Sequence, residues 1–236
     1  DFDRHQDQWR WLQYKENGYT IYKPLPRDRD QPFSKMSDGF VGEVAVALIP
    51  NARSFRKYNP ELKDVKGFTR NTYALDKAII INSTKAVWDK QVEFIQTNIT
   101  DHIIDEAFKM LPKEVNDSTV TEIKNLLKER KNHLQNTSDR YFKLINKYAV
   151  IRGTNKDDYI KIENQEDGQV QVQLFTKKKS GFKNEFFNRT YNPEQTKEKR
   201  MYGIDGDDSF EVIRKSKKIK IRHIGGHHNE DKKKKK

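Results

Sequence analysis

The sequence contains no cysteine among its 236 residues. A chain without cysteine has no disulfide and no thiolate metal ligand, which excludes zinc-finger modules and cysteine nucleophiles. Long apolar runs are also missing, because no stretch reaches the roughly 20 residues that a membrane-spanning helix needs. Hydrophobic residues make up 33% of the chain and charged residues 35%, so we expect a thin core surrounded by polar helices and loops.

Negative charge is the scarcer sign. The chain has 47 Lys and Arg residues against 35 Asp and Glu residues, which gives a formal net charge of +12. This excess favours an anionic partner such as phosphate, nucleic acid or a membrane surface. Proteins that bind nucleic acid interleave aromatic residues with their basic residues. The lysine-rich run at 176–183 carries one aromatic residue, so nucleic acid is not expected as a partner.

Residues 1–81 have the composition of strands and loops. The segments 19–22, 41–49 and 74–81 are rich in β-branched and aromatic residues, and Pro and Gly separate them. We expect three short strands here.

Apolar residues then recur every three or four positions as far as residue 147, which predicts long amphipathic helices. Thr100 and Asp101 can both cap a helix, so a break is expected there. Thr119 and Glu122 have the spacing of a capping box, which predicts the start of a further helix.

After this point apolar residues recur at every second position, as in the alternating segment 169–175. Three segments share an apolar entry, a glycine turn and acidic or amide residues: 151–162, 201–212 and, more loosely, 223–232. Their uneven spacing argues against a regular array, but they predict a small β-domain whose strands meet at Gly-Asp turns.

These patterns together predict an α+β chain. We expect an α+β domain at 1–147, a β-rich domain at 148–231 and a lysine tail at 232–236.

One glycine turn partly matches the Gly-Gly-x-Gly-x-Asp-x-apolar repeat of calcium-binding β-rolls, through Gly203, Gly206, Asp208 and Phe210. Calcium prefers several hard oxygen ligands, so we expect Ca²⁺ to bind the carboxylates of Asp205, Asp207 and Asp208. The alternative is a turn in which these residues make local hydrogen bonds.

The most informative stretch is the opening DFDRHQDQWRW, followed by YKPLPRDRDQPF. The first motif resembles the catalytic loop of atypical kinases, in which Asp-Arg-His precedes an amide residue one short loop later. The spore-coat CotH-type kinases and the secreted-protein kinases are similar, because both pair this loop with an Asp on a downstream hairpin. The resemblance covers about residues 1–145 and implies a kinase-like C-lobe of β-hairpins and long helices.

The resemblance also implies roles for individual residues. Asp3 would accept the proton of the attacking hydroxyl, with Arg4 and His5 in the same catalytic loop. Gln8 falls at the amide position and, with Arg27, would bind the cofactor, Mg²⁺ or Mn²⁺ with ATP. A carboxylate of the second motif would bind the metal, either Asp28 or Asp30.

The sequence departs from the kinase pattern in two respects. Gln8 is longer than the usual Asn and is a poorer metal ligand. The chain also begins without Met, inside the motif, and lacks the upstream Lys and Gly-rich loop that grip the phosphates. We therefore expect an N-terminally incomplete kinase-like domain from a longer protein.

The order of motifs along the whole chain is also similar to the central region of large bacterial outer-membrane proteins. In that family a calcineurin-like phosphoesterase domain commonly precedes this region, and a barrel of the BamA/TamA type follows it. The resemblance implies the bacterial cell envelope, in the periplasm or at the outer membrane, and the remainder of a larger envelope protein or its barrel as partner. The chain itself contains no Gly-Asn-His-Asp phosphoesterase motif.

Three interpretations remain open. The first is a metal-dependent, kinase-like phosphotransferase domain. The second is a non-enzymatic periplasmic or surface module whose β-turns bind calcium or a partner. The third is purely structural: Arg4, Arg27 and Arg29 would pair with the neighbouring carboxylates, while Trp9 and Trp11 pack in the core.

Overall fold

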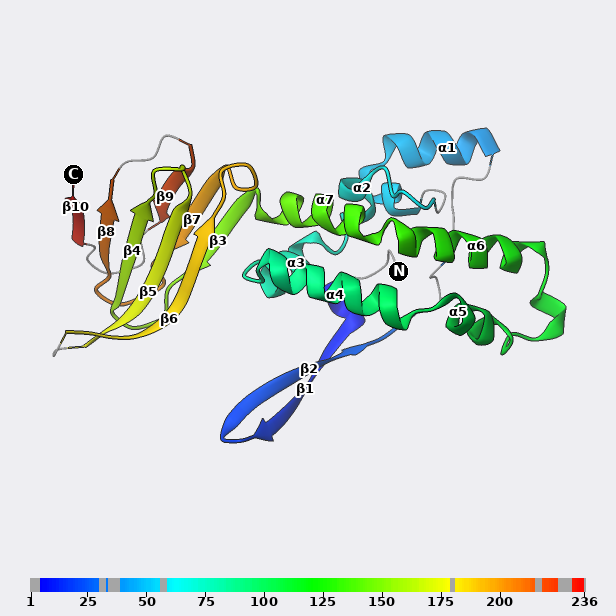
Figure 1. Cartoon of the computed structure of the whole chain (residues 1–236), viewed down its shortest axis with the longest axis horizontal. Helices are drawn as coiled ribbons and strands as arrows, with labels where there is room; N and C mark the ends of the chain where they lie inside the picture. Colours follow the sequence, from blue (N-terminus) through cyan, green and yellow to red (C-terminus); the bar gives the residue numbers. More distant parts are fainter. Residues whose placement is uncertain are drawn as a thin grey trace. The chain divides into compact units, whose positions relative to one another are not determined.

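The computed structural model describes residues 5–29, 33, 39–55, 59–178, 181–214, 218–224 and 231–235 (Figure 1). The chain divides into two compact units, residues 1–144 and 145–236. The division lies close to the boundary expected at residue 147. The first unit is mainly helical and the second is built of strands, so the α+β class expected from the sequence is confirmed.

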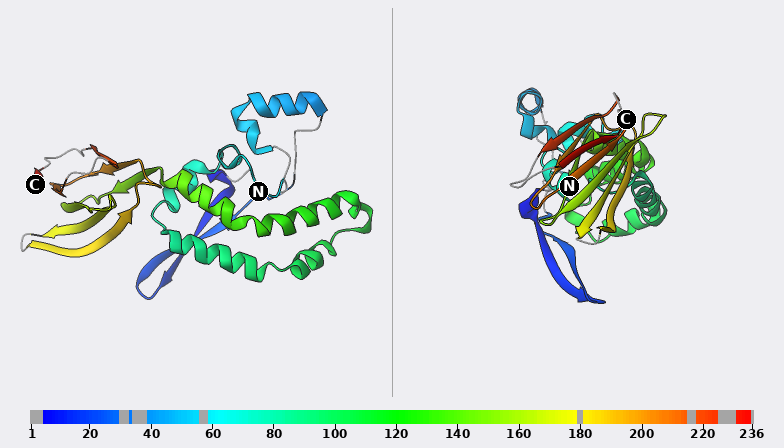
Figure 2. Two further views of the ribbon diagram at one scale, coloured as in Figure 1. Left: turned by 45° about the horizontal axis from the view of Figure 1, so that its top comes forward. Right: turned by 90° about the vertical axis from the view of Figure 1, so that its left-hand side faces the viewer.

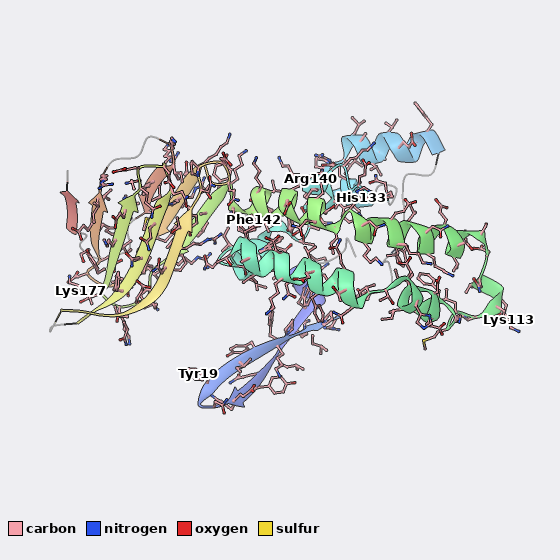
Figure 3. The ribbon with its side chains drawn as sticks, viewed as in Figure 1. Tyr19, Lys113, His133, Arg140, Phe142 and Lys177 are labelled. Carbon is pink, nitrogen blue, oxygen red and sulfur yellow. The ribbon has the colours of Figure 1, made fainter. Side chains whose placement is uncertain are left out.

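The first unit begins with the 3₁₀ helix η1 (Gln6–Gln8) and a hairpin of β1 (Trp9–Glu16) and β2 (Tyr19–Pro26). The strands pair antiparallel along their whole length. The connecting residues Asn17 and Gly18 have φ values of 50° and 80°, and Asn-Gly is the favoured pair where a two-residue turn needs positive φ at both positions. Tyr19, at the turn end of the hairpin, is 74% exposed (Figure 3).

Two of the expected strands are helices. The segment 41–49 lies mostly in α1 (Gly39–Leu48), and 74–81 lies mostly in α3 (Tyr73–Ile79). The strand predictions were wrong because short runs of Val, Ala and Ile suit an apolar helix as well as a strand, and periodicity does not separate the two.

The longer helices follow the predicted periodicity: α4 (Lys85–Asn98), α5 (Asp101–Phe108), α6 (Ser118–Asn132) and α7 (Leu134–Asn146). Three short helices were not predicted: η2 (Pro50–Phe55), α2 (Val65–Phe68) and η3 (Lys113–Val115). The break between α4 and α5 is capped by Thr100, whose hydroxyl accepts a hydrogen bond from Ile103 N at 3.2 Å. The start of α6 differs from the prediction, because Asp117 is the N-cap and accepts from Thr119 N at 2.8 Å. Among the described residues, no helix has both the length and the apolar character to cross a bilayer.

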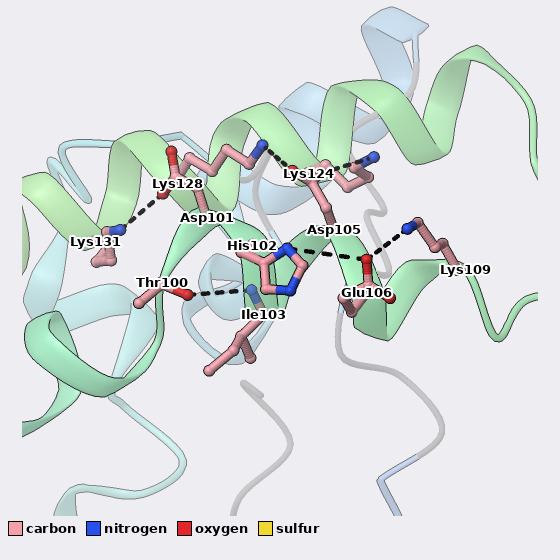
Figure 4. Close-up of polar contacts among 10 residues, drawn as sticks. All are labelled: Thr100, Asp101, His102, Ile103, Asp105, Glu106, Lys109, Lys124, Lys128 and Lys131. Carbon is pink, nitrogen blue, oxygen red and sulfur yellow. Dashed lines mark hydrogen bonds and ion pairs between the residues drawn. The ribbon is translucent and has the colours of Figure 1, made fainter.

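Ion pairs join α5 to α6 (Figure 4). Asp105 on α5 lies 2.9 Å from Lys124 Nζ and 2.8 Å from Lys128 Nζ, which follow each other on one face of α6. A further pair links Asp101 to Lys131 at 2.7 Å. The hydrogen bonds from Lys128 and Lys124 lower the pKa of Asp105 to about 2. The carboxylate of Asp105 therefore helps to hold the short helix α5 against α6.

Replacing Asp105 with Asn is expected to lower the urea midpoint of the chain at pH 7. The contribution of this carboxylate is fully present above its ordinary pKa of 3.8 and is lost as the pH falls through about 2. The difference between the variant and the wild type should therefore narrow below pH 4, as measured by circular dichroism. Glu106→Gln is the control, because Glu106 pairs with Lys109 on its own helix. Equal midpoints for wild type and Asp105→Asn at pH 7 would contradict this role.

The second unit contains two sheets (Figure 2). One has the order β3-β7-β9 and is parallel; the other has the order β10-β8-β4-β5-β6, with β10, β8 and β4 parallel and the β5–β6 hairpin antiparallel. The strands are β3 (Tyr148–Arg152), β4 (Asp158–Asn164), β5 (Val170–Lys178), β6 (Gly181–Tyr191), β7 (Glu198–Tyr202), β8 (Ser209–Ile213), β9 (Lys220–Ile224) and β10 (Asp231–Lys235). Residues 232–235 of the segment expected to be a lysine tail thus lie in the edge strand β10.

The three similar segments of the sequence are three stacked layers. Each layer contributes one strand to each sheet: β3 and β4 in the first layer, β7 and β8 in the second, and β9 and β10 in the third. In both sheets, residues paired between the first and second layers are 50 positions apart in the sequence. Residues paired between the second and third layers are also a constant, shorter distance apart in the sequence. The layers are therefore in register. Along the chain, the β5–β6 hairpin comes between the first and second layers, and in the sheet it extends the edge beside β4. This insertion explains the uneven spacing of the similar segments in the sequence.

The core of this unit is formed by residues that alternate along the strands, as in β4, where every second residue is buried. Its buried members include Ile151, Ile160, Ile162, Val172, Leu174, Met201 and Phe210. Lys199 on β7 is also fully buried. Its Nζ donates to Val170 O at 3.2 Å and lies 4.3 Å from the centre of the Tyr191 ring. Burial, with a smaller effect of the nearby Arg189, lowers the pKa of Lys199 from 10.5 to about 6.

We expect the stability of the second unit to rise with pH between about 6 and 10.5. In this range the unfolded chain binds a proton at Lys199 that the folded chain does not, so the slope approaches about 1.4 kcal/mol per pH unit. Lys199→Met should raise the free energy of unfolding at pH 7 and flatten the slope, whereas Lys197→Met, at an exposed neighbouring position, should do neither. Urea denaturation at several pH values measures both quantities, and an unchanged slope in Lys199→Met would show that another group titrates.

Candidate functional site

The predicted kinase-like residues that the structure describes gather at the open end of the β1–β2 hairpin. Antiparallel pairing brings the residues before β1 next to the residues after β2. Arg27 N donates to Gln8 O at 2.8 Å, which extends the ladder beyond Trp9 and Pro26. Asp3, Arg4 and Asp30 lie outside the described residues.

Gln8 and Asp28 are in direct contact. Gln8 Nε2 donates to Asp28 Oδ2 at 3.0 Å, and the Gln8 residue is only 7% exposed. This bond points the amide nitrogen toward the carboxylate, so the amide carbonyl faces another direction. Amide and carboxylate oxygens are both ligands that Mg²⁺ accepts. The structure therefore places two of the predicted ligand types side by side.

The backbone of Asp28 is in the left-handed region, with φ of 51°. Such conformations are uncommon for residues other than Gly, although Asp and Asn adopt them more readily than most. Strained backbone of this kind concentrates at functional sites. The conformation turns the chain sharply after β2, at the point where the Asp28 side chain meets Gln8.

His5 and Arg29 complete the described part of this region. The His5 imidazole caps η1, because its Nδ1 accepts from Asp7 N at 3.3 Å. The Arg29 guanidinium lies over the Trp9 ring at 4.9 Å. The structural interpretation expected Trp11 in the core, but Trp11 is 43% exposed.

Within the described ranges, no group of three or more His, Asp or Glu side chains is placed to hold a metal ion. Mg²⁺ usually takes only one or two protein carboxylates, together with water and phosphate oxygens.

The acidic turns of the second unit join its first two layers. Asp208 Oδ1 accepts from Asp158 N at 3.0 Å, and Asp157 Oδ1 accepts from Asp207 N at 2.9 Å. Asp208 and Asp158 are buried. Asp205 accepts from the adjacent Gly206 N at 3.1 Å. The carboxylate of Asp205 thus makes a local hydrogen bond, as the turn interpretation expected, whereas that of Asp208 bonds to a backbone amide in the neighbouring layer.

Gly206 is required where the two turns meet. Its φ is 95°, and a Cβ at this position would lie 2.6 Å from the carbonyl carbon of Lys156 in the neighbouring layer. The sequence analysis did not identify Asp157 and Asp158 as partners of this turn. The sequence feature that could have identified them is the Asp-Asp pair, which occurs at the same position in both similar segments, at 157–158 and at 207–208.

Asp208→Ala should destabilise the second unit by about 1–3 kcal/mol, because it leaves the buried amide of Asp158 without its acceptor. The calcium prediction is tested separately by Asp205→Ala, whose carboxylate accepts from Gly206 N in its own turn. If Ca²⁺ binds here, it should raise the melting temperature of the wild type but not of Asp205→Ala. A calcium effect that survives this variant would place the ion elsewhere.

Comparison of the chain with protein-family models, with curated proteins and with solved structures finds no match. The resemblances to kinases and to envelope proteins therefore stay predictions, and the function has to be argued from the geometry at the open end of the hairpin.

Proposed function

We propose that the chain is a kinase-like, metal-dependent phosphotransferase domain of a bacterial cell-envelope protein, with its reactive centre at the open end of the β1–β2 hairpin. The observation that carries the proposal is the contact between Gln8 and Asp28. These residues are 20 positions apart in the sequence, and each was assigned to the metal and nucleotide by a different motif. The hydrogen bond between them supports the proposal that both belong to one metal and nucleotide site.

The chemistry of phosphoryl transfer fits the residues present. Such transfer depends mainly on positioning and on neutralising the charge of the phosphates. Asp28 would hold the Mg²⁺ or Mn²⁺ bound to ATP, and Gln8, whose amide nitrogen donates to this carboxylate, would orient it. Arg27 and Arg29 flank Asp28 in the sequence and add positive charge next to the phosphates. The general base is Asp3, whose assignment rests on the sequence motif.

The envelope location rests on the order of motifs along the chain, and the proposed partner is the remainder of a larger envelope protein or its barrel. The alternative function is a non-enzymatic periplasmic or surface module. Its support is the stack of parallel layers in the second unit, whose edge strand β10 pairs on one side with β8. Strands at a sheet edge can bind an extended partner segment.

The proposal is tested by Asp28→Asn. Asparagine tolerates the left-handed backbone and can still accept the hydrogen bond from Gln8, so the variant removes the charge and leaves the local structure in place. We expect the affinity for Mn²⁺·ATP, measured by titration calorimetry, to fall at least tenfold. Glu166→Gln, which removes one exposed carboxylate in the second unit, should bind as the wild type does.

Two outcomes would overturn the proposal. One is equal affinity for Mn²⁺·ATP in the wild type and in Asp28→Asn. The other is a wild-type chain that does not bind Mn²⁺·ATP at all, with the fold verified by circular dichroism.

A further inference from the structure

The first unit contains an apolar cavity of about 560 Å³ between α4 and α7, which α2 and the end of α3 also line. Its walls include Val65, Trp88, Val92, Ile95, Leu134 and Tyr141. The volume lies within the range of about 300–1,000 Å³ that small-molecule sites occupy. None of the described residues that line it is charged.

The aromatic wall of this cavity is held in place by its neighbours. The Trp88 ring packs edge-on against Tyr141, with 5.9 Å between ring centres. The Tyr141 hydroxyl donates to the carboxylate of Asp76, which is 3% exposed. The position of the wall is therefore fixed by buried contacts on its far side, which favours a preformed site.

Two hydroxyl groups on α7 line the same cavity. Ser138 Oγ and Thr137 Oγ1 are buried, and neither has a hydrogen-bond partner within the described part of the chain. Ser138 is 8% exposed as a residue. Buried polar groups in folded proteins almost always have a partner. The pair therefore points to a hydrogen-bonding group that enters the cavity from outside.

We propose that this cavity binds a neutral, largely apolar small molecule with a single hydrogen-bonding group, such as a long-chain alcohol. The apolar body lies against Trp88, Val92 and Ile95, and the polar end bonds to Ser138 and Thr137. A charged head group is disfavoured, because burying it here would cost its hydration without supplying an opposite charge. The site uses no residue of the β1–β2 hairpin, so it stands independently of the proposed phosphotransferase centre.

The test uses three probes of equal chain length on the full chain: 1-decanol, decanoate and decane. Trp88 lies in the wall, so its fluorescence reports binding, and Trp88→Phe identifies the signal of the other two tryptophans. We expect saturable binding of 1-decanol, with decanoate and decane each at least tenfold weaker. No saturable binding below the solubility limit of 1-decanol, or equal binding of decanoate, would overturn the proposal.

Two variants locate the site. Ser138→Ala should lower the affinity for 1-decanol at least tenfold and leave the affinity for decane unchanged, because the variant removes only the hydrogen bond. Val87→Trp, at a half-exposed position on α4 that lines the cavity, should abolish binding of both probes by filling the space. Phe94→Trp, also exposed on α4, is the matched control. Wild-type affinity in Ser138→Ala, or in a folded Val87→Trp, would contradict the assignment.

Discussion

The register of one antiparallel hairpin is the constraint on which the candidate site depends. The pairing runs without a bulge from Glu16 opposite Tyr19 to Trp9 opposite Pro26, and the bond from Arg27 N to Gln8 O continues it. A slip of one residue would move every side chain to the opposite face. It would also separate Gln8 from Asp28. The Asn-Gly turn therefore fixes, from the far end of the hairpin, which residues meet at the open end.

Register is also decisive in the second unit. Parallel strands are not joined by a tight hairpin turn, so other contacts must set how they align. Bonds between Asp157 and Asp207, and between Asp158 and Asp208, join the turn of the first layer to the turn of the second. Gly206 lets the two backbones approach closely enough for these bonds to form. The acidic turns thus have a structural task in joining these two layers.

The parts of the fold that sequence predicted well are those governed by local rules. The helical stripe from Trp88 onward, the cap at Thr100 and the alternation at 169–175 each follow from neighbouring residues. The strand predictions at 41–49 and 74–81 were wrong, because composition alone does not separate an apolar helix from a strand. The stacked layers were visible only as similar segments, since register depends on pairing between residues far apart in sequence. The contact between Gln8 and Asp28 follows from the hairpin register and not from either motif alone.

The hairpin that carries the site is also weakly supported. Two-stranded hairpins are marginally stable by themselves, and this one keeps Trp11, Tyr14 and Tyr22 about half exposed. Its described internal supports include Lys23 above the Tyr14 ring at 4.9 Å. A ligand that bridges Gln8 and Asp28 would close the open end and so would stabilise the paired state by mass action. Under the proposed function, ligand binding and ordering of the hairpin would therefore be coupled, and the measured affinity would include the free energy of holding the two strands in register.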